Sequence, residues 1–159
     1  MAANTSVATS AGTTFSVAAA GVQPTTYNAA GYASLTWVAV GEVTDLGEFG
    51  RKYNLVTHNP VGNRSTQKFK GSFSEGSLTL QLGLQTDDAG QIILKSAVNS
   101  DLNFSYKVTT QNGDTYYFQA QCLSFMVGVG GVDKITSATV NLELTTNNAG
   151  VGIVESLTV

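Results

Sequence analysis

Apolar and polar residues alternate with a period of two in several stretches of this chain, the pattern of half-buried antiparallel strands. The alternation runs through residues 35–43, 78–84 and 140–145. It recurs on both sides of Asn112-Gly113, in residues 104–108 and 116–122. Asn-Gly between two such runs favours a hairpin, because both residues tolerate the positive φ of a type I′ turn. The pattern therefore predicts a mainly β fold, an antiparallel β-sandwich or barrel.

The apolar phase changes by one residue after Cys122. Before this point the apolar positions include Phe118 and Cys122, and afterwards they are Leu123, Phe125 and Val127. Such a shift turns the side chains to the opposite face of the sheet unless a β-bulge absorbs it. We expect the strand to bend here from one sheet into another and to end at a loop over the glycine-rich residues 128–131.

One helix is predicted among the strands, over residues 87–99. Asp87 is the expected N-cap, and Asp88 adds negative charge to the first turn. Ile92, Ile93 and Ala97 form a narrow apolar stripe that would pack on one flank of the sheet. The two aspartates could instead belong to a metal site, but no further carboxylate or histidine lies at ligand spacing.

The N-terminal residues 1–31 have neither a sustained period nor any charged side chain. We expect them to form an arm that is mobile in the monomer and orders against a neighbouring copy. A plain disordered terminus is the alternative interpretation. Residues 32–159 would then form a single β-sandwich domain.

Length and composition agree with one domain. A chain of 159 residues buries about 70% of its unfolded surface without metals or disulfides. The single Cys122 excludes an intramolecular disulfide framework and suits a reducing compartment. Neither a basic leader nor an apolar run of the roughly 18 residues that span a bilayer is present, so synthesis in a cytoplasm is expected. Charged residues make up 12% against a usual ~25%, which favours a place inside an assembly.

The charges are segregated along the sequence. Residues 51–70 carry five Lys or Arg and no acid in a chain of net charge −3, so the remainder carries −8. This segment is longer than a usual connection of about 4 to 6 residues and lacks a regular apolar pattern. We expect a projecting loop or hairpin over residues 47–73 that meets the acidic surface of another copy. The expected contact residues are Arg51, Lys52, Tyr53, Arg64, Lys68, Phe69 and Lys70.

Other functions of the basic segment and of the reactive side chains are disfavoured. A nucleic-acid patch with Tyr53 and Phe69 as stacking partners conflicts with the overall acidity. His58 is the only histidine, and Cys122 is in phase with core positions. The glycines of residues 128–131 precede a β pattern where a dinucleotide loop requires a helix. No catalytic, cofactor or metal site is predicted.

The order of the sequence motifs is similar to that of a known family. The chain contains, in succession, GEVTDLGEFG (41–50), Lys68-Phe69-Lys70-Gly71, DDAGQIILKSAV (87–98), GDTYYFQAQCLSF (113–125) and GVDKITSATVNLEL (131–144). This succession resembles the major tail tube protein of long-tailed, non-contractile bacteriophages over about residues 30–146. No single motif is diagnostic, and the order carries the resemblance.

The resemblance implies a structural protein of the virion tail with no active site. In that family a β-sandwich flanked by a helix closes into hexameric rings, which stack into the hollow tube that conducts the genome during ejection. The implied partners are further copies of the chain, the tape-measure, tail-tip and tail-terminator proteins, and double-stranded DNA in passage, with no membrane. A tail terminator would form one ring only. A carbohydrate- or receptor-binding β-sandwich of a tail tip is disfavoured, because Trp37 is in phase with core positions.

A tube that lets DNA slide needs a lumen of negative potential. The polar partners of the leucine ladders, with two nearby acids, are the expected lumen residues. These are Glu42, Asp45, Gln81, Gln85, Asn141 and Glu143.

Overall fold

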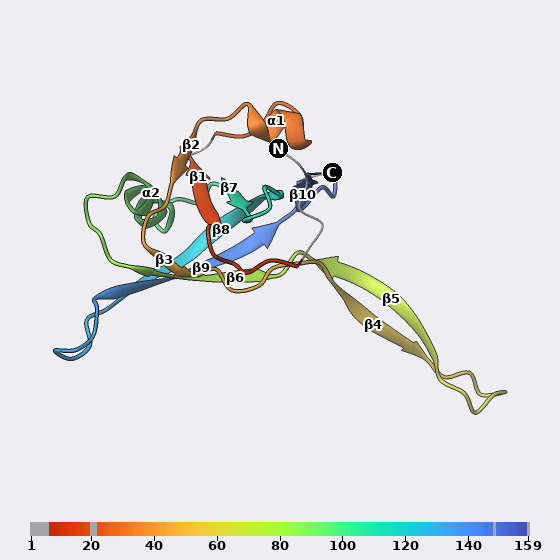
Figure 1. Ribbon diagram of the computed structural model, residues 1–159. Helices are drawn as coiled ribbons and strands as arrows, with labels where there is room; N and C mark the ends of the chain where they lie inside the picture. Colours follow the sequence, from red (N-terminus) through yellow and green to blue (C-terminus); the bar gives the residue numbers. More distant parts are fainter. Residues whose placement is uncertain (1–6, 20–21, 148, 159) are drawn as a thin grey trace.

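The computed structural model describes residues 7–19, 22–147 and 149–158, and its elements are mostly strands (Figure 1). Two helices interrupt them, α1 (Ala29–Ala33) and α2 (Ala89–Ala97). The strands are β1 (Thr14–Ala18), β2 (Trp37–Ala39), β3 (Val43–Asp45), β4 (Lys52–His58), β5 (Gln67–Ser74), β6 (Ser77–Gly83), β7 (Phe104–Thr109), β8 (Thr115–Gly128), β9 (Ser137–Thr145) and β10 (Val154–Ser156). The fold is mainly β, as predicted.

An eight-stranded antiparallel sheet forms the body, in the order β2-β1-β7-β8-β9-β6-β3, and β10 also pairs with β8. The first part of β8 pairs with β7 and β10, and its second part pairs with β9. The register shifts between Cys122 and Ser124, so a bulge absorbs the phase change. Strand β8 stays within one bent sheet and does not pass into a second one as expected. Over the described residues the sheet stays open and does not close into a barrel.

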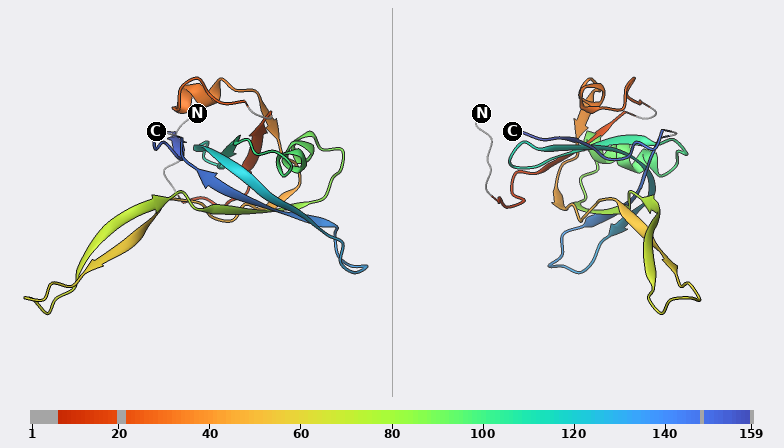
Figure 2. Two further views of the ribbon diagram at one scale, coloured as in Figure 1. Left: turned by 180° about the vertical axis from the view of Figure 1, so that it is seen from behind. Right: turned by 90° about the vertical axis from the view of Figure 1, so that its right-hand side faces the viewer.

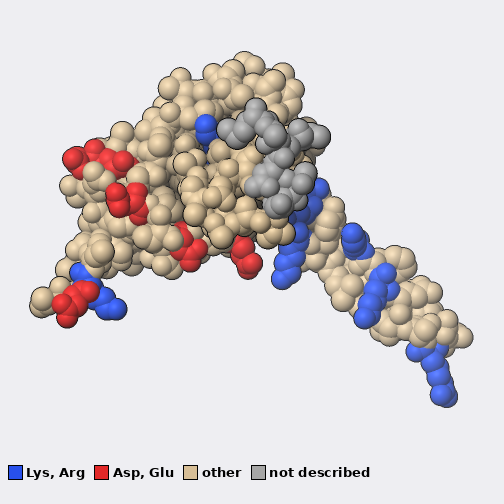
Figure 3. Space-filling view, in the orientation of Figure 1, with Lys and Arg blue, Asp and Glu red and all other residues tan. Residues whose placement is uncertain are grey.

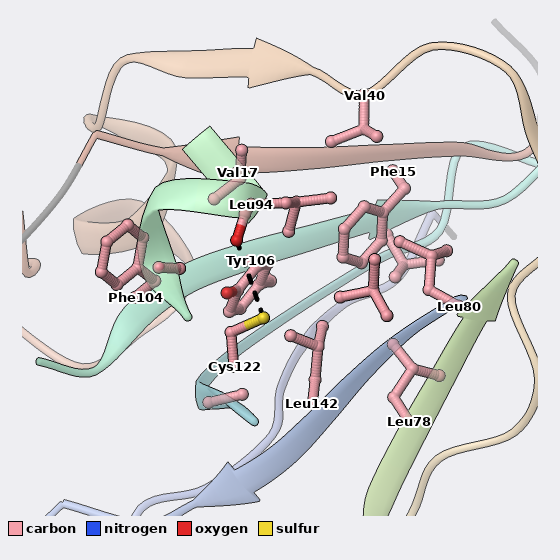
Figure 4. Close-up of a cluster of buried hydrophobic side chains, with 14 of the residues drawn as sticks. Phe15, Val17, Val40, Leu78, Leu80, Leu94, Phe104, Tyr106, Cys122 and Leu142 are labelled. Atoms are coloured by element: carbon pink, nitrogen blue, oxygen red, sulfur yellow. Dashed lines mark hydrogen bonds between the residues drawn. The ribbon is translucent and has the colours of Figure 1, made fainter. Parts of the chain in front are cut away.

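The core lies between the two halves of this bent sheet (Figure 4). Leu78, Leu80 and Leu82 of β6 are fully buried and alternate with exposed polar residues. Val140 and Leu142 of β9 lie beside them on the same face. Full burial of each such side chain contributes about 1.5–3 kcal/mol, so the leucine ladder is a principal source of the stability of the body.

Helix α2 begins one residue later than predicted, because Asp88 and not Asp87 is its N-cap. The Asp88 carboxylate accepts hydrogen bonds from the backbone N–H of Gln91 at 3.0 Å and of Gly41 at 3.1 Å. The Gln91 side chain in turn donates to the carbonyls of Gly41 and Gly83. These bonds to Gly41, between β2 and β3, and to Gly83 of β6 hold the start of the helix at Asp88.

The N-terminal region differs from the expected arm over residues 1–31. Residues 14–18 form β1, which pairs with β2 and β7, and Phe15 and Val17 are fully buried. Helix α1 follows, with Asn28 as its N-cap. Strand β1 could not be predicted, because it has only five residues, four of them buried in succession, and its partner β7 lies far along the chain. Residues 1–6 and 20–21 lie outside the described residues.

The hairpin between β7 and β8 is present, but its turn is not type I′. Gly113 has a φ of 90°, whereas Asn112 has no positive φ. The N–H of Gly113 donates to the carbonyl of Thr110, and the N–H of Thr110 donates to the carbonyl of Asp114. One left-handed glycine is therefore enough to close this hairpin, as in hairpins with a type I turn and a bulge.

Candidate assembly surfaces

Strands β4 and β5 form a hairpin, here called the arm, that projects from the body as a separate two-stranded sheet (Figure 2). Residues 51–59 and 61–70 are all exposed. An isolated two-stranded hairpin is only marginally stable in water. The arm therefore depends on its anchor to the body.

An ion pair between Arg51 and Glu75 anchors the base of the arm. Arg51 Nη2 lies 2.7 Å and Nε 2.8 Å from Oε1 of Glu75, whose side chain is buried. The guanidinium also lies over the Phe73 ring, 4.0 Å from its centre. The hydrogen bond to Glu75 raises the pKa of Arg51 above its ordinary value. Gly152 packs so closely on the Glu75 carboxyl that a side chain there would overlap it. Arg51 thus has a partner in its own chain, which the sequence did not indicate.

The two faces of the arm differ in chemistry. Directly opposed residues share a face, and the register pairs Leu55 with Lys70 and Thr57 with Lys68. This face, here called the Lys68 face, also holds the Tyr53–Phe73 pair, and Lys70 Nζ lies 4.9 Å from the centre of the Tyr53 ring.

The other face, here called the Val56 face, pairs Val56 with Phe69 and His58 with Gln67. Toward the base it holds Lys52, opposite Ser74. Arg64 lies in the turn between the strands. The arm thus presents cations next to aromatic rings on one side, and on the other an apolar pair with Lys52 nearer the base.

The face of β3, β6 and β9 that points away from the core is polar. Thr79 lies opposite Asn141, with its hydroxyl 3.4 Å from the Asn141 side-chain oxygen. Glu143 lies opposite Ser77, and Asp45 opposite Gln81. None of these three strands contains a Lys or Arg. This surface, here called the outer face, is a cation-free sheet surface.

Five of the six predicted lumen residues belong to the outer face. Glu42 is among them, because a Cβ at Gly83, which would point to this side, would lie 3.6 Å from the Cβ of Glu42. Gln85 is the exception. It lies in the turn before α2, where its backbone N–H donates to Gln91 Oε1 at 2.9 Å. The structure thus brings together Glu42, Asp45, Gln81, Asn141 and Glu143 and leaves Gln85 apart.

The charges separate in space as they do along the sequence. Figure 3 shows Lys and Arg along the arm and acidic side chains on the body, mostly toward the end away from the arm.

A further exposed surface, which was not predicted from the sequence, lies on the hairpin that joins β8 and β9. There Met126 is 66% and Ile135 84% exposed. From the sequence, the apolar residues of this hairpin indicated only a strand followed by a loop, and not an exposed surface.

The chemically reactive side chains do not converge. His58 is exposed on the arm, whereas Cys122 is buried with its Sγ 3.7 Å from the Leu94 carbonyl (Figure 4). Burial raises the pKa of the Cys122 thiol to about 11. Among the residues that the structure describes, no three His, Cys, Asp or Glu side chains are grouped so that they could hold a metal. No described helix is long and apolar enough to cross a membrane.

Comparison with known proteins shows the fold. No protein-family model matches the chain, and the comparison with curated proteins gives no match. Among solved structures, a chain of the six-fold symmetrised baseplate of the anti-feeding prophage (AFP) superposes with a TM-score of 0.69 at 10% identity, over 97% of this chain and 98% of that one. A chain of the SPP1 tail tube superposes with a TM-score of 0.61 at 11% identity, over 92% of this chain and 77% of that one. The chain has the fold found in tail-tube and baseplate subunits.

Proposed function

We propose that this protein is a structural subunit that polymerises with further copies of itself into a hollow virion tail tube of stacked hexameric rings. The observation that carries the proposal is the arm, a basic hairpin with nearly every residue exposed on an otherwise acidic chain. The shared fold supports it, since the compared subunits belong to a tail tube and to a six-fold symmetrised baseplate. In this role the protein has no active site and takes no cofactor.

The open sheet supports the formation of a ring. Strand β3 pairs only with β6 among the described strands, and the second part of β8 pairs only with β9. The half-sheet β8-β9-β6-β3 therefore ends in two open edges, and exposed edges favour pairing with another chain. Copies joined edge to edge would place their outer faces on one continuous surface. If that surface lines the tube, Glu42, Asp45 and Glu143 repel the DNA phosphates during genome ejection.

The arm supports the stacking of rings. Its cations Lys52, Arg64, Lys68 and Lys70 would meet carboxylates of a copy in the adjacent ring. One exposed ion pair contributes only ~0.2–1 kcal/mol, but a tube repeats each contact around and along its axis. A modest energy per copy can then decide between growth and dispersal. The uncharged residues before β1 would add contact between copies.

The remaining partners follow from a tail tube. The tape-measure, tail-tip and tail-terminator proteins would set where the tube starts and ends, and double-stranded DNA would pass through without specific binding. The match to a baseplate chain favours a second candidate, a ring at the end of the tail that stops after one layer. The two candidates differ in whether the purified protein grows beyond a single ring.

Reversal of charge on the Lys68 face tests the proposal. We expect Lys68→Glu with Lys70→Glu to abolish tubes in electron micrographs while thermal unfolding of the monomer stays nearly unchanged, since both side chains are exposed. Thr25→Glu, an exposed change before α1, is the control and should leave tubes intact. High salt should slow the growth of the normal protein. Normal tubes from the double variant would contradict the role of the arm charge.

A further inference from the structure

The exposed large apolar residues of this protein gather in two hairpins. Of the 17 such residues among those described, six lie in the arm and its turn and six in the β8–β9 hairpin. The second set, here called the apolar knob, consists of Leu123, Met126, Val127, Val129, Val132 and Ile135. Monomeric proteins rarely concentrate exposed apolar residues in this way, and such patches mark surfaces that bind a partner.

The arm and the apolar knob project from opposite ends of the body (Figures 1 and 2). Two different surfaces at opposite ends of one molecule can form a heterologous contact that repeats from copy to copy and builds an open assembly. Further copies of the chain are thus partners that can cover the exposed apolar residues of both hairpins.

Charge favours the same pairing. The N-terminal end of α2, with Asp87 and Asp88, follows Gln85 and Thr86, which line one small cleft together with Lys95 of α2 and Phe125 of β8. These carboxylates therefore lie near the root of the apolar knob, where the Lys68 face of an incoming arm can reach them. Within the apolar knob the charges of Asp133 and Lys134 cancel. It therefore does not repel the basic arm.

The two faces of the arm decide how it docks. A ribbon of two strands exposes both faces, so a partner on one side leaves the other in water. On the Val56 face, Val56 is 48% and Phe69 55% exposed, and the two lie directly opposite each other. On the Lys68 face the rings of Tyr53 and Phe73 have cations over them, and Leu55, which is 65% exposed, lies opposite Lys70. The Val56 face thus differs in presenting two exposed apolar side chains opposite each other, whereas each exposed apolar residue of the Lys68 face lies next to a cation.

We propose that the Val56 face of the arm packs on the apolar knob of a copy in the next ring, while the Lys68 face turns toward the acidic end of α2. This inference rests on the proposed tube assembly and names the surface to which the arm binds. It adds to the ionic contact an apolar one that salt does not screen.

Serine substitutions on each side of the contact test this docking. We expect Val56→Ser with Phe69→Ser, and separately Val132→Ser with Ile135→Ser, to raise the protein concentration needed for pelletable tubes by about tenfold, a change of ~1.4 kcal/mol per added copy. The deficit should persist in high salt. Leu102→Ser with Leu157→Ser, exposed apolar residues outside both hairpins, is the control and should assemble normally.

Cross-linking tests the pairing itself. A Phe69→Cys protein is mixed with an Ile135→Cys protein under assembly conditions and treated with a short bismaleimide, with Phe69→Cys and Leu102→Cys as the control mixture. Buried Cys122 remains as a constant background. We expect a cross-linked dimer in the first mixture and not in the control.

Each outcome has a distinct meaning. Tubes of the normal protein together with normal assembly of the serine variants, or cross-linking no greater than in the control, would overturn the docking and leave the proposed function intact. Failure of the normal protein to form any ring or tube would overturn the proposed function and the docking with it.

Discussion

The body and the arm are built from the same kind of antiparallel pair, yet different interactions stabilise them. In the β6–β9 pair every second side chain is buried, including Leu80 and Val140. In the β4–β5 pair nearly every residue is exposed, including the opposed Val56 and Phe69. Hydrogen-bonded strands alone do not make a stable unit, because burial supplies most of the favourable free energy. We therefore expect the body to fold as a monomer, whereas the arm has apolar side chains that its own chain leaves uncovered.

The largest expected effect is the loss of stability when Phe15 of β1 is truncated. It shows whether β1 belongs to the folded body or to a dispensable terminal arm. Phe15 is 1% exposed and stacks on Tyr106 with ring centres 5.6 Å apart. Phe15→Ala should lower the free energy of unfolding by about 3–5 kcal/mol, through lost transfer energy and a cavity. Urea unfolding measures this change. A loss under about 1 kcal/mol would mean that β1 does not belong to the folded body.

A matched pair of substitutions compares the body with the arm directly. Leu80→Ala, at a fully buried position, should lower the free energy of unfolding by about 2–5 kcal/mol. Phe69→Ala, on the exposed Val56 face, should change it by no more than about 0.5 kcal/mol. Urea unfolding of both monomers gives the comparison, and equal losses would show that the arm is part of the cooperative core.

Loss of the ion pair that anchors the arm should loosen the arm and leave the body unchanged. Glu75→Gln removes the charge that holds Arg51, so amide hydrogen exchange should speed up in β4 and β5 while the amides of β6 and β9 stay protected. Gln81→Glu, an exposed change on the outer face, is the control. Exchange in the arm at the normal rate would mean that strand pairing alone fixes the arm.

The last expected effect concerns Cys122 and is confined to alkaline pH. Burial raises the pKa of this thiol from 9.0 to about 11 in the folded protein, so the unfolded chain loses its proton first as pH rises. Stability should therefore decline from about pH 9 toward pH 11 through this group. A Cys122→Ala protein, compared over the same range, should lack this part of the decline. Identical pH dependence of the two proteins would contradict the assignment.

The parts of the fold that the sequence predicted are those with a strict local period. The leucines of β6 alternate over seven residues, and the phase change after Cys122 marks the observed bulge. Strand β1 was missed because Phe15 and Val17 form a strand only by pairing with β7, about 90 residues later. The choice between Asp87 and Asp88 as N-cap depends on a bond to Gly41, which no local pattern contains.

The candidate surfaces were predictable to a similar extent. Charge segregation indicated an exposed segment at residues 51–70, and the polar partners of the leucines indicated the outer face. The pairing of Arg51 with Glu75 depends on the arm closing into a hairpin, so sequence alone could not show it. Gln85 was misplaced relative to the outer face because β6 ends at Gly83 and the alternation ends with it.

Cryo-electron microscopy of the purified protein is the decisive experiment for the proposed assembly. We expect stacked six-fold rings in which the outer face, with Asp45, Gln81 and Glu143, lines the channel and the arm reaches the adjacent ring. A protein that remains monomeric, or a channel lined by Lys and Arg, would contradict it.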